Sequence, residues 1–63
     1  MTKFTTIRIP QTSPDERATV IAATRLFGAQ HPERWAFRGQ VVARGEDGDG
    51  KRWADVRLQW VGE

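Results

Sequence analysis

Arginine is the residue type in this chain with the greatest capacity to bind a partner. Eight of the ten basic residues are arginine, and three tryptophans accompany them. A planar guanidinium can hold carboxylate or phosphate with paired hydrogen bonds, and tryptophan and arginine are the types richest in interface hot spots. These residues therefore indicate recognition of an anionic or protein partner. A GC-rich coding sequence, which also favours Arg and Gly, is the alternative explanation of this composition.

Residues that could support catalysis or metal binding give weaker indications. His31 is the single histidine, and the chain has no cysteine. A zinc site needs three or four ligands, and a general base needs a nucleophile within reach. The acidic turn at residues 46–50 lacks the downstream Glu of a calcium loop, and no phosphate-binding glycine loop or nucleophile elbow occurs. We therefore expect no metal, no cofactor and no enzymatic activity.

Length and composition limit the architecture. The chain has 63 residues, a formal charge of +2, 38% hydrophobic residues and 29% charged residues. A chain of roughly 60 residues supports one small core, so we predict a single domain over residues 1–63. The lack of cysteine fits a reducing compartment, and no run of about 20 apolar residues could span a membrane. We expect a cytoplasmic protein.

Three strands and one helix follow from local patterns. Alternation predicts a strand over residues 2–9, which Pro10 ends because proline cannot donate to a ladder. Ser13 and Glu16 form a capping-box pattern around Pro14, so we expect Ser13 to cap a helix that stops at Gly28. Residues 35–44 and 51–61 predict two further strands, joined by the glycine-rich turn at residues 45–50.

This element order predicts an α+β fold, in which one helix packs on one face of a three-stranded, mainly antiparallel sheet. The third strand is the most apolar, so we place it at the centre, with the first strand antiparallel to it. The helix is expected to bury Val20, Ala23, Leu26 and Phe27. The strand side chains expected beneath it are Ile7, Ile9, Phe37, Val41, Val56, Leu58 and Trp60, and alternation places Trp35 and Ala43 on the same side as Phe37.

The opposite face of the sheet is expected to be bare. By alternation it carries Phe4, Arg8, Arg38, Gln40, Arg44, Trp53, Asp55, Arg57 and Gln59. Such a face can anchor a protein partner, or it can attract phosphate and stack a base. It can equally be an ordinary solvated face, in which arginine stems shield Trp53 and Asp55 pairs with Arg38 or Arg57.

The stretch Glu46-Asp47-Gly48-Asp49-Gly50-Lys51-Arg52-Trp53-Ala54-Asp55 resembles part of a small phage-encoded anti-CRISPR protein that acts on type I Cas surveillance complexes. The chain length, the lack of cysteine and the single helix after the first strand also resemble that group. The resemblance implies a non-catalytic inhibitor that occupies a nucleic-acid path on a Cas complex in the host cytoplasm. It also implies that Lys51, Arg52 and Trp53 are contacts.

The leading hypothesis is a non-enzymatic protein-binding module that acts as such an inhibitor. The binding residues predicted for it are Arg8, Arg38, Arg44, Lys51, Arg52, Trp53 and Arg57. The alternative is a small basic nucleic-acid-binding domain that uses the arginines and Trp53 of the bare face, with an affinity that falls steeply with salt. A homodimer built by pairing of unprotected sheet edges is a third hypothesis.

Overall fold

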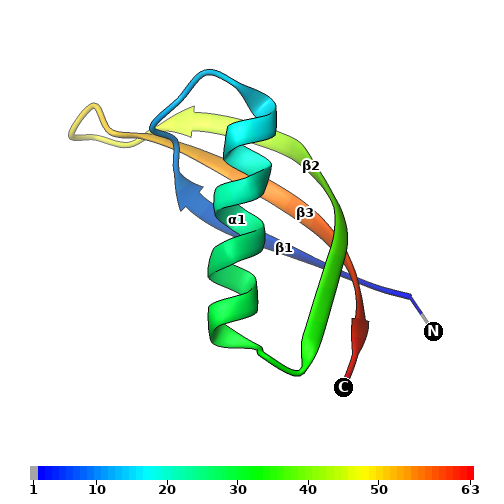
Figure 1. The fold of residues 1–63 in the computed structure, drawn as a ribbon. Helices are drawn as coiled ribbons and strands as arrows, with labels where there is room; N and C mark the ends of the chain where they lie inside the picture. Colours follow the sequence, from blue (N-terminus) through cyan, green and yellow to red (C-terminus); the bar gives the residue numbers. More distant parts are fainter. Residues whose placement is uncertain (1) are drawn as a thin grey trace.

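The computed structural model describes residues 2–63 as a three-stranded antiparallel sheet with one helix against it (Figure 1). The elements are β1 (Lys3–Pro10), α1 (Glu16–Gln30), β2 (Arg34–Glu46) and β3 (Arg52–Gly62). The strand order is β1-β3-β2, and both outer strands run antiparallel to β3. The α+β fold, the central position of the third strand and its antiparallel pairing with the first are as predicted.

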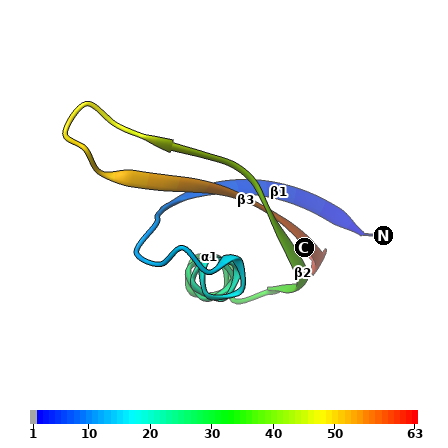
Figure 2. The same cartoon turned by 90° about the horizontal axis from the view of Figure 1, so that it is seen from above.

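The core lies on one side of the sheet only, between β3 and α1. Ala54, Val56 and Leu58 alternate along β3 and are fully buried, and Trp60 continues the row. Burial of each large apolar side chain stabilises the fold by about 1.5–3 kcal/mol. The indole N–H of Trp60 donates a hydrogen bond of 2.9 Å to Thr5 Oγ1, so its polar atom is satisfied. The other side of the sheet has no covering layer (Figure 2).

The helix begins and ends later than predicted. Asp15 is the N-cap, because its carboxylate accepts a hydrogen bond of 3.2 Å from the backbone N–H of Arg17. Ser13 is not the cap: its hydroxyl accepts from the N–H of Asp15 and forms a local turn before the helix. The helix also continues through Gly28 to Gln30, since Gly28 does not take the left-handed conformation that ends a helix.

The buried stripe of α1 also differs from the prediction. Thr19, Ala23 and Phe27, spaced by four, face the sheet, whereas Leu26 is 41% exposed. Thr19 is tolerated there because its hydroxyl donates a hydrogen bond of 3.0 Å to the carbonyl of Asp15. The helix therefore packs through small and aromatic side chains. Within residues 2–63 no helix has the length and apolar character needed to cross a membrane.

Two β-bulges in β2 change which side chains face the helix. The register against β3 shifts between Ala36 and Arg38 and again between Val41 and Ala43. Each bulge adds one residue to the strand and so reverses the side to which later residues point. Ala36 packs against the core in place of Phe37, which is 45% exposed.

The second bulge corrects one predicted binding residue. Arg44 pairs with the buried Ala54, which places it on the helix side of the sheet and not on the bare face. Ala43 takes the opposite side, because it pairs with Asp55. The predicted positions of Ala43 and Arg44 are therefore both wrong, for the same physical reason.

Candidate protein-interaction face

The uncovered side of the sheet, called the open face below, is organised by β3. Its outward residues alternate with the buried ones, so the predicted side assignment on β3 is confirmed. From Trp53 to Gln59, each outward residue of β3 is flanked by one residue from β1 and one from β2, and Val61 pairs with Trp35 of β2. The side chains that the register places on this face are Phe4, Thr6, Arg8 and Pro10 from β1, Trp35, Arg38, Gln40 and Ala43 from β2, and Trp53, Asp55, Arg57, Gln59 and Val61 from β3.

One end of the open face is a closed cluster of Arg8, Trp53, Asp55 and Gly45, called the Arg8 corner. Arg8 donates from Nε to Asp55 Oδ1 at 2.8 Å and from Nη2 to Oδ2 at 3.2 Å. The guanidinium carbon of Arg8 lies 3.7 Å from the centroid of the Trp53 ring. The ring also fills the space above Gly45, where an added Cβ would overlap it. The charge, the carboxylate and the indole of this corner are thus all partnered within the chain.

The hydrogen bonds of the Arg8 corner set the charge state of Asp55. Those from Arg8 lower the pKa of the Asp55 carboxyl below its ordinary value, and partial desolvation opposes them. The same hydrogen bonds raise the pKa of Arg8. Asp55 is therefore ionised throughout the neutral range and compensates the charge of Arg8.

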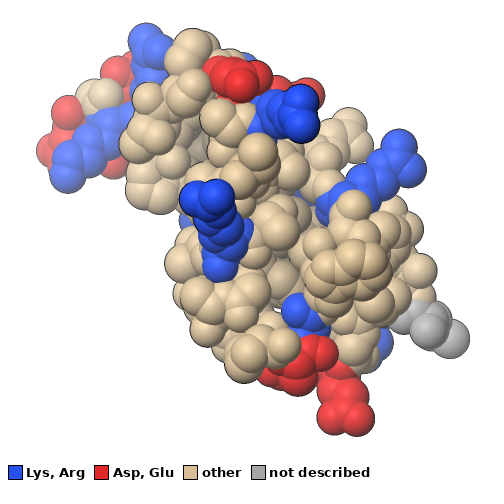
Figure 3. Space-filling model, viewed as in Figure 1, with Lys and Arg blue, Asp and Glu red and all other residues tan. Residues whose placement is uncertain are grey.

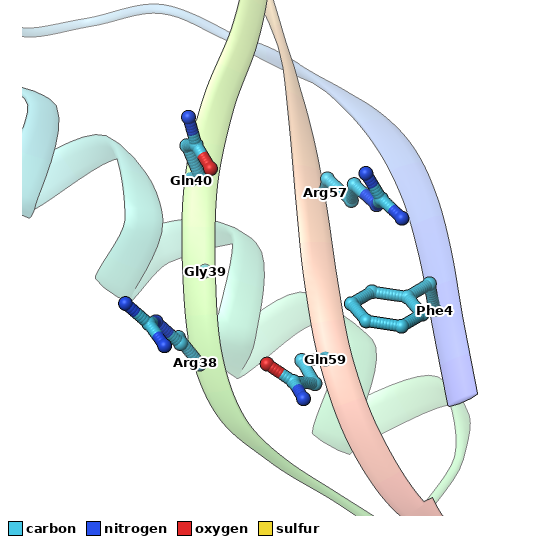
Figure 4. Close-up of a pocket in the computed structure, with 6 residues that line it drawn as sticks. All are labelled: Phe4, Arg38, Gly39, Gln40, Arg57 and Gln59. Atoms are coloured by element: carbon cyan, nitrogen blue, oxygen red, sulfur yellow. The ribbon is translucent and has the colours of Figure 1, made fainter. Parts of the chain in front are cut away.

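The middle of the open face contains a hollow of about 200 Å³, called the Arg57 hollow. The guanidinium carbon of Arg57 lies 4.3 Å from the centroid of the Phe4 ring, and Phe4 is 53% exposed. Figure 4 shows Arg38 extending away from β3 and Arg57 extending toward β1, so the two guanidinium groups flank the hollow from opposite sides. The lining residues are Phe4, Arg38, Gly39, Gln40, Arg57 and Gln59.

The Arg57 hollow is not neutralised by the chain. Among the described residues, the ion pairs within 4.0 Å involve Arg8, His31 and Arg34, and neither Arg38 nor Arg57 is in one. The predicted pairing of Asp55 with Arg38 or Arg57 is therefore wrong, because Arg8 occupies both carboxylate oxygens. Two guanidinium groups and two side-chain amides are left facing solvent.

An exposed aromatic pair extends the open face beyond the hollow. Trp35 is 68% exposed, and its ring centroid lies 5.9 Å from that of Phe37. Trp35 pairs with Val61, two rows beyond the row that joins Arg38 to Gln59. Alternation placed both aromatic residues beneath the helix, so sequence reasoning missed this pair. The run of three apolar residues at 35–37, which strict alternation does not allow, was the available signal.

The predicted hairpin contacts lie beside the Arg8 corner. Lys51, Arg52 and Trp53 join residues of β1 around a second hollow of about 350 Å³ at the base of the hairpin. The carboxylate of Asp47 accepts hydrogen bonds of 3.0 Å from the backbone N–H groups of Asp49 and Lys51, so it stabilises the turn itself. Within residues 2–63 no three potential metal-ligating side chains gather together.

Comparison with protein-family models, curated proteins and solved structures finds no match to this chain. The open face and its two clusters are therefore the basis for assigning a function.

Proposed function

We propose that this chain is a non-enzymatic protein-binding module that docks through its open face. The observation that carries the proposal is the exposure of Phe4 and Trp35 around the unpaired Arg38 and Arg57. Exposed apolar side chains rimmed by polar ones are typical of protein interaction sites. Trp and Arg are also the residue types most often found among hot spots.

Contacts between the side chains of this face support binding. The guanidinium of Arg57 already stacks on Phe4, and the rings of Trp35 and Phe37 lie against each other. Side chains held in place before binding lose less conformational entropy when the complex forms. These contacts therefore favour an interaction surface over a freely solvated face.

The geometry favours a protein partner over nucleic acid. The nucleic-acid alternative uses Trp53 to stack a base, but Arg8 lies over that ring. A phosphate backbone needs a line of cations. Asp55 compensates Arg8, and Arg44 faces the helix side, so Arg38 and Arg57 are the predicted phosphate contacts that remain on the open face.

The resemblance of residues 46–55 suggests a specific partner. On that basis we propose a type I Cas surveillance complex, whose nucleic-acid path the chain would block by steric occlusion. Lys51, Arg52 and Trp53 would then add a contact at the hairpin beside the Arg8 corner. Charge attraction to acidic patches of the complex would speed the encounter.

Affinity measurements with the immobilised chain test both levels of the proposal. Wild type is compared with Trp35→Ala and Arg38→Gln, and Ile21→Ala and Arg25→Gln on the helix serve as controls because both positions are exposed. We expect a purified type I surveillance complex to bind wild type and both controls, to lose target-DNA binding when the chain is added, and to bind the two open-face variants weakly.

Failure of the surveillance complex to bind would contradict the specific partner. A host protein captured equally by wild type and by the open-face variants would contradict the docking face. Direct binding of labelled single- or double-stranded DNA at low salt, lost in Arg38→Gln, would instead support the nucleic-acid alternative.

A further inference from the structure

We infer that the Arg57 hollow binds a peptide segment of the partner that carries two acidic side chains, one for Arg38 and one for Arg57. This inference rests on the proposed protein-binding function and specifies the partner's chemistry. Two guanidinium groups that flank one hollow and are in no ion pair within residues 2–63 are complementary to a pair of carboxylates.

The strand register explains why one segment can reach both arginines. Arg38 lies opposite Gln59, and Gln40 lies opposite Arg57; these are successive rows on the open face, with the Gly39–Leu58 row between them. Each arginine therefore lies opposite an amide, and Figure 4 shows the two guanidinium groups at diagonal positions around the hollow. Each amide carries both a donor and an acceptor, as does a peptide group. The amides of Gln40 and Gln59 could therefore hydrogen-bond the backbone of a bound peptide. The acidic side chains of that peptide would then reach Arg38 and Arg57.

Phe4 positions the guanidinium of Arg57 before a partner binds. Its ring holds the guanidinium of Arg57 at 4.3 Å and keeps the stem extended over β1. A guanidinium fixed in this way loses little side-chain entropy when it takes a carboxylate. The exposed rings of Phe4 in the hollow and of Trp35 beyond it also favour apolar side chains next to the acidic ones in the partner.

The distribution of charge favours a protein carboxylate over a phosphodiester chain. Arg8 is paired with Asp55, and Arg34 lies 3.7 Å from Glu33. Figure 3 shows acidic and basic side chains side by side near the ends of the molecule on the helix side. On the open face, the arginines that are in no ion pair within residues 2–63 are Arg38 and Arg57, which form a local patch and not a stripe. Duplex DNA carries one negative charge per roughly 1.7 Å, which a two-arginine patch matches poorly.

Fluorescence anisotropy with defined probes tests the inference. The first probe is a labelled peptide in which pairs of Glu alternate with Leu, the second is the same peptide with Gln in place of Glu, and the third is a short oligothymidylate. We expect the acidic peptide to bind about tenfold more tightly than the Gln peptide, because each guanidinium gains a charge-assisted pair. Its affinity should fall as salt increases.

Single substitutions locate the binding site. Arg38→Gln and Arg57→Gln should each weaken the acidic peptide about fivefold, and Arg25→Gln on the helix should leave its affinity unchanged. Circular dichroism and thermal melting show whether each variant is folded. Equal affinities for Arg38→Gln and Arg25→Gln, or tighter binding of the oligothymidylate at the same arginines, would overturn the inference.

The outcomes separate this inference from the proposed function. If partner capture requires Trp35 but not Arg38, and the acidic peptide does not bind, the open face docks a protein by apolar contact and the acidic segment is wrong. If no open-face variant changes capture of the partner, the proposed function is wrong. Oligomers that dissociate in Asp49→Asn would identify the turn of a second copy as the occupant of the hollow, and would contradict the separate protein partner of the proposed function.

Discussion

The Arg8 corner and the Arg57 hollow are built from the same pair of groups but have different consequences. In each, a guanidinium lies over an aromatic ring, at 3.7 Å for Arg8 on Trp53 and 4.3 Å for Arg57 on Phe4. In the corner, Asp55 takes up the charge of Arg8. In the hollow, the neighbours are neutral amides, so the charge stays available. We therefore expect the Arg8 stack to be structural, and the Arg57 stack to remain free to take a carboxylate from a partner.

Among the substitutions that test this comparison, Gly45→Ala is expected to have the largest effect on the free energy of unfolding. The added Cβ would overlap the Trp53 ring, which must leave its position against Arg8. We expect the free energy of unfolding to fall by about 1–3 kcal/mol, as for other overpacked sites. Urea unfolding followed by circular dichroism measures it.

Gly48→Ala is the matched control, because a Cβ at Gly48 meets nothing within 4 Å and its φ is not positive. Equal stability of the two variants would mean that the Arg8 corner does not constrain Trp53.

Asp55→Asn should make the stability less sensitive to acid. The folded-state pKa of Asp55 lies below its ordinary value of 3.8, so its stabilisation is complete above that value and is lost as the pH falls below it. Wild type should therefore lose more stability than Asp55→Asn when urea midpoints at neutral pH and at about pH 3 are compared. The same acid-induced loss in both proteins would contradict the assigned role of the Arg8–Asp55 hydrogen bonds.

The same substitution should convert the corner into a second binding-competent site. Asparagine cannot compensate the charge of Arg8, so the stack on Trp53 would resemble that of Arg57 on Phe4. We expect Asp55→Asn to bind the acidic Glu–Leu peptide about twofold to threefold more tightly at low salt. No gain, or a weaker affinity, would show that removal of Asp55 is insufficient to open the corner.

Most of the arrangement on β1 and β3 could be predicted from sequence. On β3 the apolar residues alternate without interruption from Ala54 to Trp60, and period-two alternation fixes both faces of a regular strand. The central position of β3, the bare face and the placement of Arg8, Trp53 and Arg57 all followed from that pattern.

The departures on β2 could not be predicted because bulges depend on packing between strands. Gly39 illustrates this: a Cβ there would lie 2.6 Å from Val20 Cγ1, so α1 approaches the β2 backbone between the two bulges. The apolar run at residues 35–37 signals that alternation breaks there, but it does not say which of the three faces the helix. The exposure of Trp35 and Phe37 and the reversal of Arg44 accompany the two bulges.

The smallest effect on stability is expected from Arg38→Gln. Arg38 is exposed and is in none of the ion pairs of residues 2–63, so its replacement should change the free energy of unfolding by less than about 0.5 kcal/mol. Urea unfolding measures this, with Arg25→Gln as the reference. A larger loss would place Arg38 among the structural arginines.

Side-chain Nε–Hε resonances of the arginines test the central claim most directly. In the free protein, the Nε–Hε groups of Arg8 and Arg34 should exchange slowly with water, because they donate to Asp55 and to the carbonyl of Glu63 at 2.8 Å. Those of Arg38 and Arg57 should exchange fast and become protected and shifted only when the acidic peptide is added. Protection of Arg38 and Arg57 in the free protein, or a peptide-induced shift confined to Arg8, would contradict the account.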